Sequence, residues 1–370
     1  MVSIVRHSKF VSNPFGDGGA KRSAQIEELL RRSGIDYSND SFELPKGMSF
    51  FTRLRLMFAG IKFVVHSFSY KEIRSLNNLI QMAKYFGLRI PVFEKYADSD
   101  VIFLNEDTTS GAYGYPYLAK STHNKMIAVP HNLESLCCDG LDCQSRKKRL
   151  LWLREDIHRL GLCDTVFCIS KEETWLLQVH GVDAHYLPYY PPKEAEDYLL
   201  NIRKKRQARI PNIRHKFLVL GSANNTPTRQ GIEELLGYLS SYEDLPFEIH
   251  VAGYKTEWLE KKLHPKIVYH GTLSKQDLES LLVEVDALII YQTASSGALT
   301  RIIEHLVAGI PVIASFAAAR DYHQVPCVQV FYSFDMLMQI LEEFLPFVAE
   351  MPQRNKASED MFAQIIKNIK

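Results

Sequence analysis

Apolar and polar positions follow two different periods that alternate along the chain. Short apolar runs, such as 126–129 and 287–290, predict strands that are buried on both faces. Other segments, such as 299–308, carry an apolar residue at every third or fourth position, which predicts helices. The alternation occurs twice, on either side of a polar segment. It predicts an α/β protein with two Rossmann-like, doubly wound domains that face a cleft.

The segment between the two series is charged and has no clear period. It runs from Glu194 to Arg214 and includes the basic run 203–206. We interpret it as an interdomain linker with a surface helix. Nucleic-acid binding is disfavoured, because no aromatic stacking platform surrounds the basic run and the net charge of the chain is only +1. The predicted organisation is an N-terminal domain, the linker, a C-terminal domain and a segment with a last helix, at residues 1–192, 193–214, 215–350 and 351–370.

Bulk properties are those of an ordinary globular protein. The 370 residues suffice for about two domains. No apolar run reaches the roughly 20 residues of a membrane-spanning helix, and the first ten residues lack the apolar core of a secretion signal. Six cysteines are ordinary for a reducing compartment, so we expect a cytoplasmic protein. Cys137, Cys138 and Cys143 share one loop, but they lack a paired C-x-x-C or a His at ligand spacing, and we expect no metal site.

The most informative stretch begins at the predicted strand 287–290. Small residues at 295–297 form a loop at the carboxyl end of this strand, and the helix predicted over 299–308 follows. The free N–H groups and positive dipole of a helix N-terminus attract anions. Arg301 lies in the first turn, and Glu304 lies three residues later on the same face. A guanidinium for phosphate beside a carboxylate for a sugar diol suggests a nucleotide-sugar pocket.

This stretch resembles the donor-site segment of GT-B retaining glycosyltransferases of the family 4 type, which reads roughly E-G-x-x-x-x-x-x-E-A-x-A-x-G-x-P-V-V. The residues that match are Gly297, Glu304, Gly309, Pro311 and Val312. His305 and Val307 replace two small alanines of the pattern, and Ser296 stands in place of its first Glu. The resemblance implies the GT-B fold, with a C-terminal helix that crosses back to the first domain.

The resemblance also covers N-terminal motifs. Gly18, Gly19 and Arg22 match a G-G-x-x-R segment that faces donor and acceptor across the cleft. His131 matches an H-N-x-E segment in which the His orients the donor sugar. Glu106 and Asp107 follow a predicted strand at its carboxyl end, where either carboxylate is a candidate to contact an acceptor hydroxyl.

The C-terminal motifs would hold the donor. The resemblance implies that the loop after the first strand of the second domain grips the diphosphate, with Ser222, Asn224 and Arg229 as candidates. Backbone groups near Gly271 would hold the nucleobase, and Ser296 and Gly297 would line the donor loop. The implied catalytic set is His131, Arg301 and Glu304. Arg301 would stabilise the leaving diphosphate, and Glu304 would bind the ribose hydroxyls.

The implied activity is a hexosyltransferase type of reaction. A sugar moves with retention from a nucleotide-diphosphate donor to a glycan, a lipid-linked acceptor or a small acceptor. No cofactor is expected, because arginines and helix ends take the place of a metal ion. Two other enzyme types on this fold stay open, a nucleotide-sugar epimerase and a phosphorylase. Ser296 also leaves open a non-catalytic partner subunit.

Residues 48–63 mix aromatic residues with Arg and Lys. This composition is typical of an amphipathic helix at a membrane surface. It predicts peripheral contact with the inner face of the membrane. The alternative is a core helix followed by a strand at 62–66.

Overall fold

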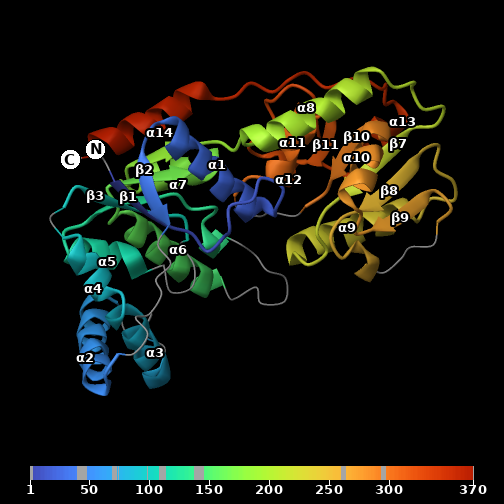
Figure 1. The fold of residues 1–370 in the computed structure, drawn as a ribbon. Helices are drawn as coiled ribbons and strands as arrows, with labels where there is room; N and C mark the ends of the chain where they lie inside the picture. Colours follow the sequence, from blue (N-terminus) through green and yellow to red (C-terminus); the bar gives the residue numbers. More distant parts are fainter. Residues whose placement is uncertain are drawn as a thin grey trace.

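The computed structural model describes residues 3–39, 48–68, 73, 75–97, 99–107, 114–136, 146–259, 264–292 and 297–369. Within them, two six-stranded parallel sheets have the orders β2-β1-β3-β4-β5-β6 and β12-β11-β10-β7-β8-β9. Helices pack around each sheet (Figure 1). The predicted fold class, two doubly wound α/β domains, is therefore confirmed.

Strands of the N-terminal sheet are β1 Ser3–His7, β2 Asp36–Asn39, β3 Val101–Asn105, β4 Lys125–Ala128, β5 Thr165–Cys168 and β6 Ala184–Tyr186. Strands of the C-terminal sheet are β7 Lys216–Leu220, β8 Glu248–Ala252, β9 Ile267–Gly271, β10 Ala287–Ile290, β11 Val312–Ser315 and β12 Val328–Phe331. The order of strands reverses between β1 and β3 in one sheet and between β7 and β10 in the other. Ligands of doubly wound sheets bind at such reversal points, outside the carboxyl ends of the strands.

Helices of the N-terminal half are α1 Gly18–Arg32, α2 Phe50–Ser67, α3 Leu76–Gly87, α4 Ile90–Lys95, α5 Tyr115–Ser121, α6 Arg146–Leu160 and α7 Lys171–Val179. The others are α8 Lys193–Gln207, α9 Thr226–Leu239, α10 Lys275–Glu284, α11 Thr300–Val307, α12 Phe316–Ala319, α13 Phe334–Glu342 and α14 Lys356–Asn368. Two of these helices have ends fixed by local contacts. Ser274 caps α10 by accepting a hydrogen bond from the N–H of Asp277 at 3.2 Å, and Gly309 follows α11 with φ +79°.

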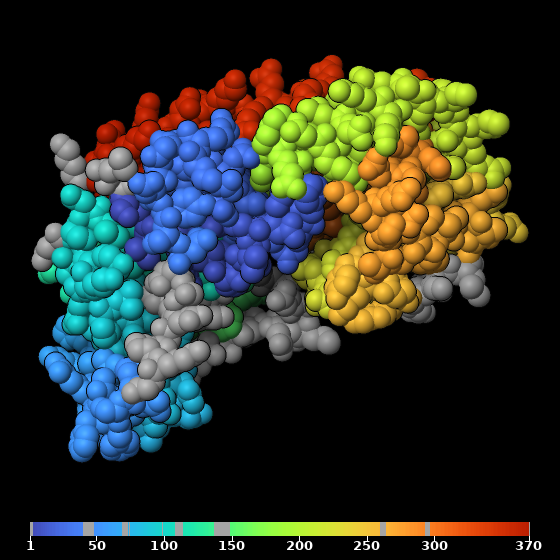
Figure 2. Space-filling view, in the orientation of Figure 1, coloured from blue at the N-terminus to red at the C-terminus, as the bar shows by residue number. Residues whose placement is uncertain are grey.

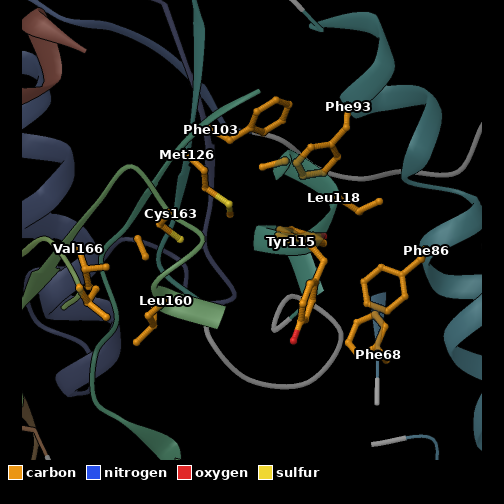
Figure 3. Packing of buried hydrophobic residues seen from close by; sticks show 14 of the residues in the cluster. Phe68, Phe86, Phe93, Phe103, Tyr115, Leu118, Met126, Leu160, Cys163 and Val166 are labelled. Atoms are coloured by element: carbon orange, nitrogen blue, oxygen red, sulfur yellow. The ribbon is translucent and has the colours of Figure 1, made fainter. Parts of the chain in front are cut away.

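Aromatic side chains fill the core of the N-terminal domain beside β3 (Figure 3). Phe93 of α4 stacks on Phe103 of β3, with ring centroids 4.2 Å apart. Phe86 of α3 contacts Phe68 at 5.3 Å, which joins the helices α2 and α3 to the rest of the core. Each such pair contributes about 0.5–1.5 kcal/mol beyond area burial.

Helices α2 and α3 form a hairpin that projects from the N-terminal domain (Figures 1 and 2). Residues 62–66, for which the sequence allowed a strand, continue α2. Close packing on α3 accompanies this continuation, since Phe63 contacts Phe86 of α3 with ring centroids 5.3 Å apart. Just before it, a Cβ at Gly60 would lie 1.9 Å from the carbonyl oxygen of Ala83, so glycine lets the two helix backbones touch.

Helix α8 occupies the segment interpreted as a linker, and its basic run is only partly on the surface. Arg206 is 2% exposed and donates hydrogen bonds to carbonyl oxygens at the end of α10, including those of Leu282 and Val285. Arg203 donates to the carbonyl oxygen of Val307 at the end of α11. These arginines satisfy helix ends that would otherwise lack partners. The sequence shows the charges but not these carbonyl partners.

Helix α14 lies against the N-terminal domain, at the far side of the molecule from α13 (Figure 1). Phe362 and Ile366 are fully buried, and the ring of Phe362 packs on Phe167 of β5 at 4.9 Å. Arg354 bridges the domains by pairing with Glu28 of α1 at 3.1 Å. The chain therefore ends on the domain in which it starts.

Candidate functional site

The two reversal points face a single cavity of about 640 Å³ between the domains. Residues after β1 and β3 form one wall, and residues after β7 and β10 form the other. Ten of the residues singled out from the sequence line it, namely Gly18, Gly19, Arg22, Glu106, Asp107, His131, Ser222, Asn224, Gly297 and Arg301. The topology thus brings together side chains that are far apart in sequence.

The glycine-rich turn brings α1 to the edge of this cavity. Asp17 caps the helix by accepting a hydrogen bond from the N–H of Ala20 at 2.9 Å. A Cβ at Gly19 would lie 2.3 Å from the ring of Phe10, so only glycine fits there. A Cβ at Gly18 would face the hydroxyl of Thr300 across the cleft at 3.8 Å. Backbone from the two domains therefore approaches closely at this point.

Glu106 belongs to a buried charge cluster in the N-terminal wall. Its carboxylate is 2.5 Å from Nε of Arg6, accepts a hydrogen bond from the hydroxyl of Ser23 and lies 3.5 Å from Nε2 of His131. Burial opposes its ionisation, but His131 and Arg6 outweigh this effect and lower its pKa to about 2. Glu106 was predicted to contact the acceptor, yet these partners already occupy both of its oxygens.

His131 is held in place by its neighbours. Its ring stacks on Phe10, with centroids 4.8 Å apart and planes 12° from parallel. The carboxylate of Glu106 lies 3.5 Å from Nε2. A carboxylate beside an imidazole helps to fix the orientation of the ring.

Arg22 is fully buried at the inner end of the N-terminal wall. Nη1 donates to Oε1 of Gln25 at 2.6 Å, whereas Nε and Nη2 have no hydrogen-bond partner among the described residues. Removal from water lowers the pKa of Arg22 to about 10, although the charge of Glu106 opposes that shift. The guanidinium is therefore a cation at neutral pH with donors to spare.

Arg301 provides the corresponding cation on the C-terminal wall. Nη1 donates to the carbonyl oxygen of Leu220 at 3.1 Å, which fixes the side chain against the end of β7. Removal from water lowers the pKa of Arg301 to about 10. In the described part of the chain, no carboxylate pairs with it and Nε lacks a partner. Gly221 leaves it room, since a Cβ there would approach Nη1 to 3.0 Å.

Glu304 lies one turn behind Arg301 and joins the two domains. Oε2 pairs with Nζ of Lys21 at 2.6 Å, and Oε1 accepts a hydrogen bond from the hydroxyl of Tyr189 at 2.9 Å. Lys21 itself lines the cavity. The carboxylate predicted to bind a ribose is thus neutralised by an ammonium group from the opposite wall.

Three predicted donor residues do not reach the cavity lining. Arg229 is exposed on α9, which starts at Thr226, and is not among the residues that line the cavity. Gly271 ends β9 with φ +69°, beside Glu257 and outside the lining. Glu304 is also not among the residues that line the cavity. Ser296 lies outside the described residues.

The sequence reading missed Lys9, Phe10 and Lys21, all of which line the cavity. Lys9 and Phe10 follow β1, so the rule that ligands bind after strand ends could have found them. Lys21 precedes Arg22 on α1 and lines the cavity together with it, but the motif of the resemblance marks only Arg22. Cys137, Cys138 and Cys143 lie outside the described residues, and in the described ranges no group of three or more His, Cys, Asp or Glu side chains could hold a metal ion.

Comparison with solved structures identifies the fold. The UDP-forming α,α-trehalose-phosphate synthase of Burkholderia xenovorans superposes with a TM-score of 0.59 at 11% identity, over 100% of this chain and 99% of that one. Sucrose-phosphate synthase of Thermosynechococcus elongatus gives 0.55 at 13% identity, over 93% and 90% of the two chains. Anabaena HepE, solved in complex with UDP, gives 0.55 at 10% identity, over 92% and 89%.

These structures confirm the GT-B architecture expected from the resemblance. At such identities the likeness concerns the fold. No family model matches the sequence, and no curated protein matches it either.

Proposed function

We propose that this protein is a glycosyltransferase that moves a hexosyl group from a nucleoside diphosphate donor to an acceptor hydroxyl, with retention of configuration. The observation that carries the proposal is Arg301, a guanidinium without a carboxylate partner among the described residues, at a strand reversal point. An uncompensated cation beside a cavity is suited to an anion that arrives with the ligand. The opposite wall contributes Arg22, whose Nε and Nη2 also lack hydrogen-bond partners among the described residues.

The donor diphosphate would lie between α11 and the loop after β7. The N-terminus of α11 and the guanidinium of Arg301 would stabilise the charge that grows on the leaving diphosphate. Ser222 and Asn224 line the same side and offer polar groups to the phosphates. Their place after β7 is where doubly wound folds bind nucleotides.

Glu304 would receive the ribose hydroxyls once Lys21 has moved. Nζ of Lys21 lies 2.6 Å from Oε2 and Lys21 lines the cavity, so a ribose that approaches this oxygen meets the Lys21 side chain first. The diphosphate offers the displaced ammonium a second anionic partner. Donor binding would thus transfer Lys21 from a protein carboxylate to the substrate.

His131 would orient the transferred sugar. Glu106 is unsuited to act as a nucleophile, because Arg6 and Ser23 occupy its two oxygens. Retention would then follow from attack on the same face of the sugar. The acceptor oxygen bonds to the anomeric carbon, the bond to the diphosphate oxygen breaks, and the acceptor proton passes to the departing phosphate.

The α2–α3 hairpin would rest on an anionic membrane surface and favour a lipid-linked acceptor. Phe50, Phe51 and Phe58 are 73%, 80% and 60% exposed. The same helix carries Arg53, Arg55 and Lys62 and no acidic residue. Aromatic and basic side chains together are typical of interfacial helices. No described helix has the length and apolar character needed to cross a bilayer.

A thermal-shift screen with UDP, GDP, ADP and CMP tests the donor site. A nucleotide at about 100 times its dissociation constant raises the apparent stability by about 2.7 kcal/mol. We expect one nucleotide to act, and Arg301→Ala to abolish its effect. Arg229→Ala is the matched control, because this arginine is exposed outside the cavity. Absence of any shift in the wild type would contradict the proposal and favour a partner subunit.

Sedimentation with vesicles tests the membrane contact. We expect binding to vesicles that contain phosphatidylglycerol, and its loss in the double variant Phe50→Ser, Phe51→Ser. Phosphatidylcholine vesicles should bind less, because they lack the net negative charge that attracts the basic residues of α2. Equal binding of the variant would exclude the hairpin as the contact.

A further inference from the structure

The first turn of α7 contacts both loops that close the cavity. Glu173 is the third residue of this helix, and its side chain is 2% exposed. One carboxylate oxygen, Oε1, accepts a hydrogen bond from the N–H of Leu133 at 3.1 Å and another from the N–H of Gly297 at 2.9 Å. Leu133 belongs to the loop that carries His131, whereas Gly297 belongs to the donor loop. A single atom therefore joins the two walls.

The peptide group of Gly297 is fixed on both sides. Its N–H is held by Glu173, and its carbonyl oxygen accepts a hydrogen bond from Arg320. Gly297 has φ +70°, and a Cβ there would lie 3.1 Å from the carbonyl oxygen of His131 and 3.2 Å from Cβ of Asn132. The donor loop thus rests directly on the backbone of the His131 loop, with no room for a side chain between them.

Helix α7 does not depend on the side chain of Glu173 for its own N-terminus. Ser170 caps it by accepting the N–H of Glu173 at 3.3 Å, and Asp321 of the C-terminal domain accepts the N–H of Lys171 at 2.8 Å. The second oxygen of Glu173, Oε2, is buried without a hydrogen-bond partner among the described residues. Burial of a carboxylate is unfavourable unless hydrogen bonds compensate it. Burial raises the pKa of Glu173, and the two N–H groups on Oε1 oppose that shift.

We propose that Glu173 is a positioning residue that sets the separation between His131 and the donor loop. The catalytic meaning of this role rests on the proposed glycosyl transfer, whereas the link between the loops does not. Glu173 is outside the cavity lining of the described chain, so it acts through the two loops and not on a ligand. Loss of the Glu173 carboxylate should increase the distance between the two loops, while the nucleotide-binding groups stay intact.

Amide hydrogen exchange tests the link without a substrate. In Glu173→Ala, we expect faster exchange in peptides that cover Leu133 and Gly297, because both N–H groups lose their acceptor. Glu173→Gln keeps an oxygen acceptor and should restore most of the protection. Ser170→Ala is the matched control, since it removes the cap of α7 and should speed exchange in α7 alone. Wild-type exchange of both loops in Glu173→Ala would overturn the proposal.

Kinetics with UDP-glucose and binding of UDP separate this inference from the proposed function. In Glu173→Ala we expect unchanged UDP affinity and KM, and a fall in kcat of about 100-fold, the loss that a misplacement of about 1 Å can cause. Glu173→Gln should recover most of kcat. An active wild type with full kcat in Glu173→Ala contradicts the positioning role. A wild type that neither binds UDP nor consumes UDP-glucose, but whose loops loosen in Glu173→Ala, contradicts the proposed function and leaves the link established.

Discussion

The two walls of the cavity treat charge in opposite ways. On the N-terminal wall, Glu106 is surrounded by Arg6, Ser23 and His131, so its charge is compensated within the protein. On the C-terminal wall, Arg301 contacts a carbonyl oxygen and has no carboxylate partner among the described residues. Compensated buried charge holds a structure together, whereas an uncompensated cation is available to a ligand. The difference indicates that the N-terminal wall orients the ligand, whereas the C-terminal wall binds its anionic group.

Arg22 is intermediate between these two cases. It belongs to the N-terminal wall, and its Nε and Nη2 have no hydrogen-bond partner in the described part of the chain, but Glu106 is close enough to favour its charged form. Its charge is therefore partly compensated, which places it between Glu106 and Arg301. Variants of the two walls should accordingly separate stability from activity.

Glu106→Gln should have the largest effect, and the effect should be on stability. The amide keeps the shape of the side chain but removes the nearest counter-charge of the buried Arg6, 2.5 Å away, and leaves only the more distant carboxylate of Glu27 at 3.6 Å. Breaking a buried ion pair in this way costs about 3–5 kcal/mol. The free energy of unfolding from urea titration measures it. A loss below that of Arg301→Ala in the same titration would contradict the division between the walls.

Arg301→Ala should lower activity instead. Loss of one donor that stabilises transition-state charge costs about 2–4 kcal/mol, or roughly 30-fold to 10³-fold in rate. The ratio kcat/KM with the donor found by the nucleotide screen measures it, and Arg229→Ala is the control. Near-wild-type turnover of Arg301→Ala would refute the role of this wall in binding the diphosphate.

The charge cluster around Glu106 should also make the free energy of unfolding depend on pH in the acid range. Glu106 has its pKa lowered from 4.5 to about 2 in the folded protein. Between these values the unfolded chain binds more protons, so the contribution of Glu106 is complete above pH 4.5 and is lost as the pH falls toward 2. The slope is at most about 1.4 kcal/mol per pH unit. Urea titrations between pH 3 and pH 6 should show less slope for Glu106→Gln, and equal slopes would contradict the cluster.

Lys9→Gln should have the smallest effect. Lys9 is 38% exposed and lies 3.6 Å from Asp107 at the rim of the N-terminal wall. Asp107 is buried, but the ammonium of Lys9 is open to water and salt, which screen the pair, so we expect it to contribute about 0.2–1 kcal/mol. The midpoint of thermal unfolding should therefore change little. A loss of stability as large as that of Glu106→Gln would mean that rim charges and buried charges contribute equally to stability. This outcome would contradict the proposed difference between the walls.

Local sequence determined the strands of both sheets, the helix caps and the place of the glycine in the donor loop. Apolar runs such as 287–290 are buried strands, because a strand covered on both faces needs apolar residues on both sides. Ser274 and Gly309 act at helix ends through contacts within a few residues. The place of His131 and Arg301 at the cavity follows from the same local rules, since parallel strands present their carboxyl ends to one edge.

Tertiary structure alone decided which charges are free. Arg6 and Glu106 are 100 residues apart, and nothing near either one predicts the pair. Lys21 reaches Glu304 across 283 residues because the two domains close against each other, and Glu173 meets Gly297 across 124. The continuation of α2 through 62–66 likewise depends on contacts with α3. Secondary structure is set by short-range periodicity, whereas compensation of charge depends on which side chains the fold brings within a few ångströms.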